Sequence, residues 1–337
     1  MTSVAVVILN YNGRDLLRKF LPSVIQHSPT AHVVVVDNGS SDDSHAVVTK
    51  EFPSVTLIQI SANLGFCGGY NHALREIEAD YNVLINSDVE VTAGWLDSLI
   101  KLLDENPAAA AVQPKILSYN KRNFFEYAGA AGGFIDSLGY PFCRGRLFHS
   151  LEEDLGQYND RREIFWASGA CMIVRAKLFN EVGGFDEDFF AHMEEIDLSW
   201  RLQRAGYKIF YEGASTVYHS GGSTLSASNP KKTYLNFKNG LSLLYKNLPE
   251  NELAVKFLLR IVLDWVASLK FSLSGSWQHG KAVLKAHQHF LKNWEREKIR
   301  RKQVAKLGFK KLPNQYRGSI VWDFFVAGKR KYSQLKS

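Results

Sequence analysis

Cysteine is scarce in this sequence of 337 residues, which holds three: Cys67, Cys143 and Cys171. Their number is odd and no two of them have a Cys-x-x-Cys spacing. The sequence therefore supports neither a disulfide framework nor a zinc ribbon, and a reducing, cytosolic setting is expected.

Long hydrophobic runs are also missing. No stretch reaches the roughly 18 uncharged apolar residues that a membrane-spanning helix needs. Met1 leads almost directly into the apolar run Val4–Leu9, with no basic segment and no small-residue cleavage site, which indicates a buried strand rather than a signal peptide. No Gly-x-Gly-x-x-Gly follows this run, so a dinucleotide-binding dehydrogenase loses its main signature.

Charge is present but unevenly distributed. Residues 1–245 carry 21 Lys and Arg against 28 Asp and Glu, a net charge of −7, whereas residues 246–337 carry 20 against 6, a net charge of +14. Such asymmetry predicts an anionic partner for the basic tail, either a membrane surface or nucleic acid.

The first hundred residues alternate short, β-branched apolar runs with segments of helical periodicity. Near-continuous apolar strands that alternate with helices are typical of an α/β fold, with a mostly parallel central sheet covered on both faces. The expected strands are Val4–Leu9, Val33–Val36, Val55–Ile60 and Asn82–Ile85, and the expected helices are Asp15–Gln26, Ser44–Glu51 and Tyr70–Glu78.

Polar and small residues follow each of the four expected strands. One such loop would be ordinary turn chemistry, but four of them meet at the carboxyl edge of a parallel sheet, where ligands bind. They predict a nucleotide-binding edge in which Asp37 accepts hydrogen bonds from a base or ribose. The loops supply the candidate nucleotide-binding residues Asn10, Tyr11, Asn12, Asp37, Asn63, Gly65, Asn86 and Ser87.

Asp88 ends the fourth of these loops and is a candidate metal ligand. Mg²⁺ and Mn²⁺ take oxygen ligands from one or two carboxylates and complete their shell with phosphate oxygens and water, so one carboxylate suffices. His219 follows a later apolar segment and is a candidate second ligand, although a lone histidine is more often structural.

A helix expected from about Met193 to Ala205 begins with three neighbouring carboxylates, Glu194, Glu195 and Asp197. Acidic residues in the first helical turn are explained by the helix dipole. A general base would have to be one of the three, and the chemistry alone does not say which.

Beyond about residue 231 the sequence becomes helical, aromatic and basic. In Leu253–Ser272 the charged residues Lys256, Arg260 and Asp264 recur every fourth position, so most of the helix circumference is apolar. Two interpretations stay open: the helix is buried in protein, or it lies in a membrane interface, which the basic run Arg296–Lys302 favours. We divide the chain into residues 1–230, with halves 1–107 and 108–230, and residues 231–337.

Six strings, in order over residues 1 to about 225, resemble glycosyltransferase family 2 and its rhamnosyltransferase-like branch, which has the GT-A fold. They are VVILNYNG, VVDNGSSDDS, ISANLGFCGGYNHAL, VLINSDVEVTAGWL, FWASGACMIVRAKLFNEVGGFDEDFFAHMEEIDLSWRLQRAGY and VYHSGGST. The resemblance implies an inverting enzyme in which a divalent metal, Mn²⁺ or Mg²⁺, assists a single displacement.

The same resemblance implies roles for individual residues. Asp88 corresponds to the metal-binding acid of the family's Asp-x-Asp motif, in which Asn86 replaces the first Asp. Glu195 corresponds to the catalytic base, and His219 to a late metal ligand. The segment that borders donor sugar and acceptor contributes Trp166, Gly169, Glu194 and Asp197.

The resulting hypothesis is transfer of a sugar from a nucleotide-sugar donor to a lipid-linked saccharide or polysaccharide precursor at the inner membrane face. The branch favours dTDP-rhamnose, with UDP-hexoses next. A non-catalytic nucleotide-sugar-binding module of the same fold is the alternative. Nucleic-acid binding by the tail is disfavoured, because its aromatics are not interleaved as a stacking platform and the acidic N-terminal region repels phosphates.

Overall fold

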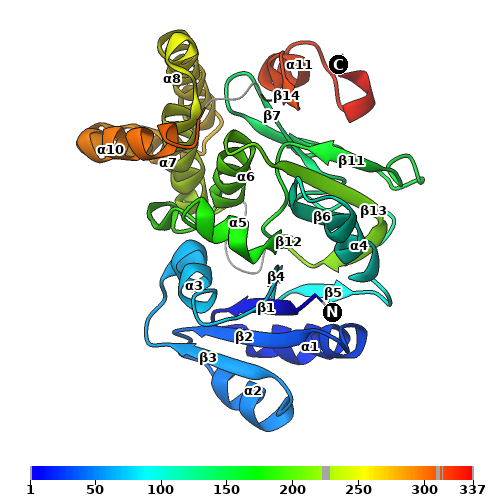
Figure 1. Cartoon of the computed structure of the whole chain (residues 1–337). Coiled ribbons are helices and arrows are strands. Elements are labelled where there is room, and N and C mark those ends of the chain that lie inside the picture. Colours follow the sequence, from blue (N-terminus) through cyan, green and yellow to red (C-terminus); the bar gives the residue numbers. More distant parts are fainter. Residues whose placement is uncertain (1, 222–227, 309–311, 313, 336–337) are drawn as a thin grey trace.

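A computed structural model describes residues 2–221, 228–308, 312 and 314–335 (Figure 1). Its N-terminal part is a parallel sheet of order β3-β2-β1-β4. The strands are β1 (Val4–Asn10), β2 (His32–Asn38), β3 (Thr56–Ile60) and β4 (Tyr81–Asn86), and the connecting helices are α1 (Arg14–His27), α2 (Ser44–Glu51) and α3 (Gly65–Ala73). The expected α/β alternation is confirmed.

The third expected helix is wrong in position. Instead of Tyr70–Glu78, α3 spans Gly65–Ala73. Side chains from neighbouring loops satisfy its first amides: the Asn63 carbonyl accepts from the Gly65 N–H at 2.8 Å, and the Asn38 carbonyl accepts from the Leu64 N–H at 3.0 Å. Helix periodicity does not reveal such tertiary capping.

The sheet continues from β4 through β12 (Cys171–Arg175), β6 (Ala109–Ser118), β13 (Lys208–His219) and β11 (Arg161–Ile164). Strand β12 runs antiparallel to both β4 and β6, and β13 runs parallel to β6. The end of β13 also pairs with β5 (Val89–Val91), where His219 lies opposite Val89. This pairing brings the end of β13 to the carboxyl end of β4.

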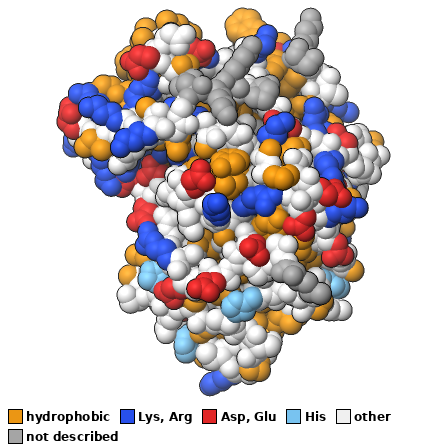
Figure 2. Space-filling model, viewed as in Figure 1, with side chains coloured by type: hydrophobic (Ala, Val, Ile, Leu, Met, Phe, Trp, Pro, Cys, Tyr) orange, Lys and Arg blue, Asp and Glu red, His pale blue; other side chains and the backbone are white. Residues whose placement is uncertain are grey.

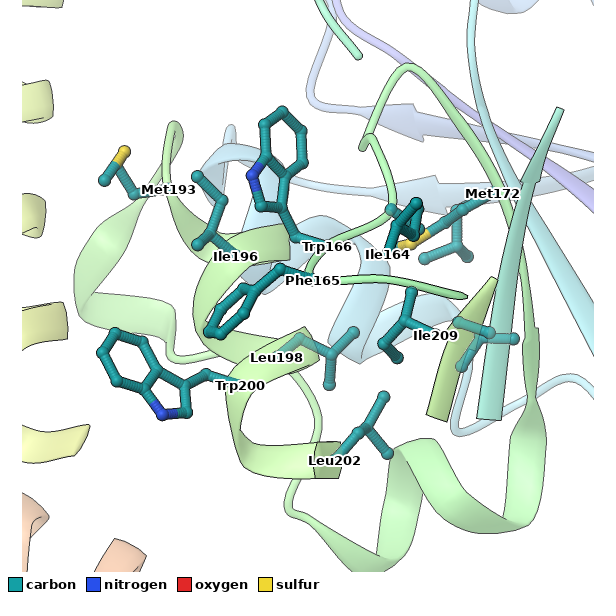
Figure 3. Packing of buried hydrophobic residues seen from close by; sticks show 14 of the residues in the cluster. Ile164, Phe165, Trp166, Met172, Met193, Ile196, Leu198, Trp200, Leu202 and Ile209 are labelled. Atoms are coloured by element: carbon teal, nitrogen blue, oxygen red, sulfur yellow. The ribbon is translucent and has the colours of Figure 1, made fainter. Parts of the chain in front are cut away.

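Three further helices accompany this half of the sheet: α4 (Asp97–Glu105), α5 (Ala176–Glu181) and α6 (Glu194–Arg204), with a 3₁₀ turn, η1 (Glu187–Phe189), before α6. Helix α6 turns apolar side chains toward the sheet, and Phe165 packs edge to face on Trp200 with ring centroids 5.3 Å apart (Figure 3). This packing fixes the position of the acidic start of α6.

A smaller sheet has the order β10-β9-β8-β7-β14. Its members are β7 (Gly133–Asp136), β8 (Pro141–Cys143), β9 (Arg146–Leu147), β10 (Ser150–Leu151) and β14 (Gln315–Tyr316). Strand β14, close to the end of the chain, pairs in parallel with β7, so the C-terminal part returns to the body of the protein.

The region after residue 230 is helical, as expected. It contains α7 (Pro230–Asn247), α8 (Glu250–Leu273), α9 (Trp277–Lys292), α10 (Trp294–Ala305), α11 (Ile320–Phe325) and the 3₁₀ turn η2 (Tyr332–Gln334). Leu243 and Leu244 of α7 and Phe324 of α11 belong to the same hydrophobic core as the sheet. The division at residue 230 stays a prediction, and the two parts share this core. Within the described residues, no helix combines the length and apolarity that crossing a bilayer requires.

Candidate active site

The ends of β1, β2 and β4 lie side by side at one edge of the sheet. Asn10 is paired in register with Asp37, and Leu9 is paired with Asn86. Asn10 and Asp37 are buried, and the Asp37 carboxylate accepts a hydrogen bond from the Ser40 N–H at 3.2 Å. The structure therefore brings together the polar residues that the sequence placed at separate strand ends.

The loop after β1 is closely fitted to the loop after β2. Asn12 has a positive φ of 52°, and its side-chain oxygen accepts from the backbone N–H groups of Ser41 and Asp42 at 2.7 and 3.3 Å. A Cβ on Gly13 would lie 2.3 Å from the Asn10 Oδ1 and 3.6 Å from the Ser87 Oγ, so any larger residue there would displace the buried Asn10 side chain. Tyr11, in the same loop as Asn12, is 46% exposed, so its ring is accessible to a ligand.

Asp88 and His219 meet at the same edge. The Nε2 atom of His219 lies 3.1 Å from the Asp88 Oδ1 and 3.4 Å from the Asn86 Nδ2. On its other side the His219 Nδ1 lies 3.1 Å from a carboxylate oxygen of Glu126. The side chains of Asp88, His219 and Glu126 are all nearly buried. His219 thus lies between two carboxylates.

These neighbours set the protonation of His219. Burial alone would lower its pKa, but the close polar contacts with Asp88 and Glu126 and the negative charges of these carboxylates outweigh burial and raise the pKa to about 10. The imidazole is therefore protonated on both nitrogens at neutral pH, and a divalent cation could replace the proton on Nε2, which faces Asp88.

Asp88 and His219 suit a metal in donor chemistry and in spacing. Octahedral Mg²⁺ with bonds of about 2.1 Å places neighbouring donors about 3 Å apart, and the Asp88 and His219 donor atoms lie 3.1 Å apart. No group of three or more His, Cys, Asp or Glu is placed to hold a metal ion in the part of the chain that the structure describes. Phosphate oxygens and water would therefore have to complete the shell.

Two carboxylates, one buried and one partly buried, begin α6. Glu194 is 5% exposed and Glu195 is partly buried, and one oxygen of each, Oε2, has no hydrogen-bond partner within the described residues. Burial raises the pKa of Glu195 to about 7. Burial, followed by the charge of Glu195, raises the pKa of Glu194 well above its usual value. A carboxylate with a pKa near neutrality is suited to accept a proton at physiological pH.

The segment before α6 is strained. Phe190, His192 and Met193 have positive φ angles of 63°, 70° and 72°, and non-glycine residues rarely adopt this conformation outside sites that hold them there. Burial lowers the pKa of His192 to about 4, so its ring is neutral in the folded protein. The left-handed conformation of Met193, directly before α6, sets the direction in which the chain enters the helix and so the orientation of its first residues.

Contacts with α3 and α7 hold this segment. The Phe190 carbonyl accepts from the Phe66 N–H at 2.7 Å, and a Cβ on Gly65, whose φ is +74°, would lie 2.6 Å from that carbonyl oxygen. The Asn239 side-chain amide donates to the carbonyls of Phe189, Ala191 and His192 at 3.0, 2.9 and 2.6 Å.

The two sides of the site are joined through the segment before β12. The Asn86 N–H donates to the Ala170 carbonyl at 3.0 Å, and a Cβ on Gly169 would lie 3.1 Å from the Phe66 ring. Trp166 is buried nearby (Figure 3), and its indole N–H donates to the Phe134 carbonyl at 2.8 Å. Short contacts therefore connect the Asp88 edge to the turn that carries Glu195.

Asp197 lies on the side of α6 that faces α7. Its fully buried carboxylate accepts from the Arg201 Nε at 2.8 Å and from the Asn247 Nδ2 at 3.0 Å, and it lies 3.1 Å from the Lys246 Nζ. The structure places Asp197 in an ion cluster between two helices rather than beside Asp37 and Asp88. The fourth acceptor-side candidate, Glu194, begins the same helix.

Two residues of this site were not predicted from the sequence. Glu126 lies in a Gly- and aromatic-rich stretch without a motif, and Asn239 lies in the C-terminal region, outside the strings that resemble a family. Only the fold brings Glu126 to His219 and Asn239 to the turn before Glu194.

Residues 5–183 match Glycosyl transferase family 2. The chain is 29% identical over 262 residues to the N-acetylglucosaminyl-diphospho-decaprenol L-rhamnosyltransferase of Mycobacterium tuberculosis, an alignment that covers 70% of this chain and 84% of that protein.

Two solved structures share the fold. GalNAc-T7 with UDP, GalNAc and Mn²⁺ has a TM-score of 0.55 at 15% identity over 72% of this chain, and the match covers about half of that longer chain, 48%. The mannosyltransferase PcManGT of Pyrobaculum calidifontis with GDP-Man and Mn²⁺ has a TM-score of 0.51 at 14% identity, over 90% of this chain and 86% of that one.

These likenesses confirm the GT-A fold that the sequence strings implied. The family match covers more than half of the chain and includes the four loops of the nucleotide-binding edge and Asp88. The chain is a glycosyltransferase and belongs to glycosyl transferase family 2.

Proposed function

We propose that this enzyme transfers a sugar, with inversion, from a nucleotide-sugar donor to a hydroxyl group of a lipid-linked saccharide or polysaccharide precursor. dTDP-rhamnose is the favoured donor and a UDP-hexose is the next, because the chain resembles a rhamnosyltransferase that acts on a lipid-linked sugar. The observation that carries the proposal is the convergence of Asp37, Asp88 and the turn before Glu195 at one edge of the sheet.

In this proposal each part of the site has one task. Asp37 and Asn10 bind the nucleoside, with Tyr11 beside them. A divalent cation, Mn²⁺ or Mg²⁺, held by Asp88 and His219 would neutralise charge on the departing diphosphate. Glu195 accepts the proton of the acceptor hydroxyl as its oxygen attacks the anomeric carbon. Burial favours this transfer, since it keeps the pKa of Glu195 near that of a useful base.

Thermal-shift measurements with dTDP-, UDP- and GDP-sugars, with and without Mn²⁺, test donor and metal together. A ligand that binds only the folded protein raises its melting temperature by mass action. We expect one donor class to stabilise the protein, and to do so more strongly with Mn²⁺. Equal responses with and without Mn²⁺ would argue against the role given to Asp88 and His219.

The variant Glu195→Gln separates an enzyme from a module that only binds a nucleotide sugar. It keeps the shape of the side chain but removes the basic oxygen, so we expect a loss of turnover of about a hundredfold or more, the usual contribution of general-base catalysis. Donor binding in the thermal-shift assay should persist. Unchanged turnover would show that another group is the base, whereas a wild-type protein that binds donor without any turnover would support the module.

The place of action that we propose is the cytoplasmic face of the cell membrane. A lipid-linked acceptor resides there, and the basic C-terminal region is suited to an anionic membrane surface. Nucleic acid is not part of the proposal.

A further inference from the structure

Helix α8 buries its central polar residues against the protein and turns most of its apolar residues to solvent, while Phe257 and Ile261 pack inward. Arg260, Asp264 and Ser268 recur every fourth position and are 3%, 0% and 7% exposed. Val255, Leu258, Leu259, Val262, Trp265, Val266 and Leu269 are between 46% and 66% exposed, and we call these seven residues the outer face of α8. A helix on the surface of a protein that meets only water has the opposite arrangement.

The inward polar residues hold α8 in this orientation. Arg260 donates from Nε to the Asp264 carboxylate at 2.8 Å, and the same carboxylate accepts from the Tyr140 hydroxyl at 3.0 Å. The Ser268 hydroxyl donates to the Gly280 carbonyl of α9 at 3.0 Å. The Arg260–Asp264 pair lies within α8 and would survive a rotation of the helix. A rotation that buried the outer face would instead separate Asp264 from the Tyr140 hydroxyl, and Arg260 from the carbonyls of Leu138 and Gly139, which lie 3.3 and 3.4 Å away. The exposure of the outer face is therefore built into the fold.

The apolar surface continues beyond α8. The Lys270 ammonium lies 4.3 Å from the centre of the Phe325 ring, which places α11 next to the end of α8. Trp322, Phe325 and Val326 are 62%, 47% and 61% exposed. In Figure 2 hydrophobic side chains gather at the upper end of the molecule, where Figure 1 shows α8 and α11. Exposed apolar side chains in such number on one side of a protein mark an interaction site.

The basic run Arg296–Lys302 belongs to α10, on the left of Figure 2. Its arginines form ion pairs with carboxylates of the same chain. Arg296 pairs with Asp188, and Arg300 pairs with Asp186 and Asp188. Arg301 lies 2.7 Å from the Glu250 carboxylate and donates to the Leu248 carbonyl at 2.8 Å. These arginines fasten α10 to η1 and to the start of α8, so they are poor candidates for the main membrane contact.

We propose that the outer face of α8, together with Trp322 and Phe325 of α11, is a membrane-binding surface that inserts into the apolar boundary of a lipid bilayer. Lys270 is exposed and lies beside the Phe325 ring at the edge of this surface, and long lysine side chains reach from an apolar interface to lipid phosphates. This inference deepens the proposed function, since it names the surface that would bring the site to a lipid-linked acceptor.

Charge favours a bilayer over a second copy of the chain. Residues 246–337 carry a net charge of +14, so a symmetric dimer through α8 would bring two strongly positive regions together. An anionic bilayer has the complementary charge, and tryptophan side chains such as Trp265 and Trp322 are suited to its interface.

Vesicle sedimentation of the full chain tests this surface. The vesicles are phosphatidylcholine alone and equal parts phosphatidylcholine and phosphatidylglycerol, at about 0.1 M and about 1 M NaCl, where the Debye length falls from about 10 Å to about 3 Å. The triple variant Leu258→Gln, Val262→Gln, Leu269→Gln makes the outer face polar. The control Lys302→Gln, Lys306→Gln removes two exposed lysines at the end of α10.

We expect the wild-type protein to bind the mixed vesicles at both salt concentrations, the triple variant to bind roughly tenfold or more weakly, and the control to bind like the wild type. Binding that disappears at high salt, no binding to either vesicle, or unchanged binding of the triple variant would overturn the inference. So would a wild-type dimer that the triple variant converts to a monomer, because a second copy would then cover α8.

Two measurements keep the result independent of folding and of catalysis. Donor-induced thermal stabilisation of each variant, measured without vesicles, reports whether the active site is intact, so a failure of the membrane surface and a failure of the proposed transfer are separate results. Lipids brominated in their acyl chains quench tryptophans that enter the bilayer, and Trp265→Phe should remove part of that quenching. Equal quenching in the two proteins would contradict insertion of α8.

Discussion

The side-chain amide of Asn239 lies 2.6 Å from the carbonyl oxygen of His192, two residues before Glu194. It also donates to Phe189 and Ala191, so one side chain of α7 holds three backbone groups of the strained turn. Residues 5–183 carry the family match, and both this turn and Asn239 lie beyond it. A helix outside the matched region therefore positions the candidate base.

Asn239→Ala should lower kcat by about tenfold or more while leaving donor binding nearly unchanged, because a misplacement of about 1 Å at a catalytic group is costly. A lower kcat together with an unchanged donor-induced thermal shift would identify a positioning role for Asn239. Asn293→Ala is the matched control, since the Asn293 amide donates to a helix carbonyl, that of His289, at 2.9 Å on the surface. A parallel loss of both properties in Asn239→Ala would indicate unfolding instead.

Glu126→Gln should weaken activation by Mn²⁺. Glu126 orients His219 from the side opposite to Asp88, and loss of such an outer partner reduces metal affinity by about 10- to 100-fold. The measurement is a Mn²⁺ titration of transfer activity and of the donor-induced thermal shift. Glu153→Gln, an exposed carboxylate that accepts from Asn123 at 2.8 Å, is the control. An unchanged Mn²⁺ requirement would exclude this role for Glu126.

Asp197→Ala should destabilise the protein by about 3 kcal/mol or more, because it removes one carboxylate from buried Arg201 and Lys246. Denaturant unfolding measures the effect. Asp43→Ala removes the exposed partner of Arg14 and should cost less than about 1 kcal/mol. A small effect of Asp197→Ala, combined with a large loss of turnover, would return Asp197 to the acceptor side that the sequence predicted.

The nucleotide-binding edge could be predicted from the sequence because each polar loop directly follows an apolar strand, and parallel strands end together. The register of Asn10 with Asp37 follows from the same rule. Glu126 could not be predicted, since its meeting with His219 depends on a strand pairing far away in the sequence. The periodicity of the sequence predicts that α8 has a polar and an apolar face. Which face is turned outward depends on the buried carbonyls that Arg260 contacts, and these become known only from the fold.

The pH dependence of transfer identifies which carboxylate is the base. With the pKa of Glu195 raised by burial to about 7, the reactive carboxylate form increases as pH rises, so kcat/KM should increase through pH 7 and then level off. Glu194→Gln should keep this rise of kcat/KM with pH, because Glu195 is still present and free to ionise. In Glu195→Gln the rise of kcat/KM with pH should vanish together with the activity.

The raised pKa of Glu195 also predicts that stability falls as pH rises, whereas activity increases. A carboxyl group whose folded pKa of about 7 exceeds its usual 4.5 stabilises the fold fully below pH 4.5, and this contribution is lost as pH rises through 7. Glu195→Gln, which cannot ionise, should therefore be more stable than the wild type at pH 8 and lose this advantage toward pH 5. Chemical unfolding at both pH values measures the difference. A wild-type protein as stable as the variant at pH 8 would mean that Glu195 is well solvated, and burial would then no longer explain its basicity.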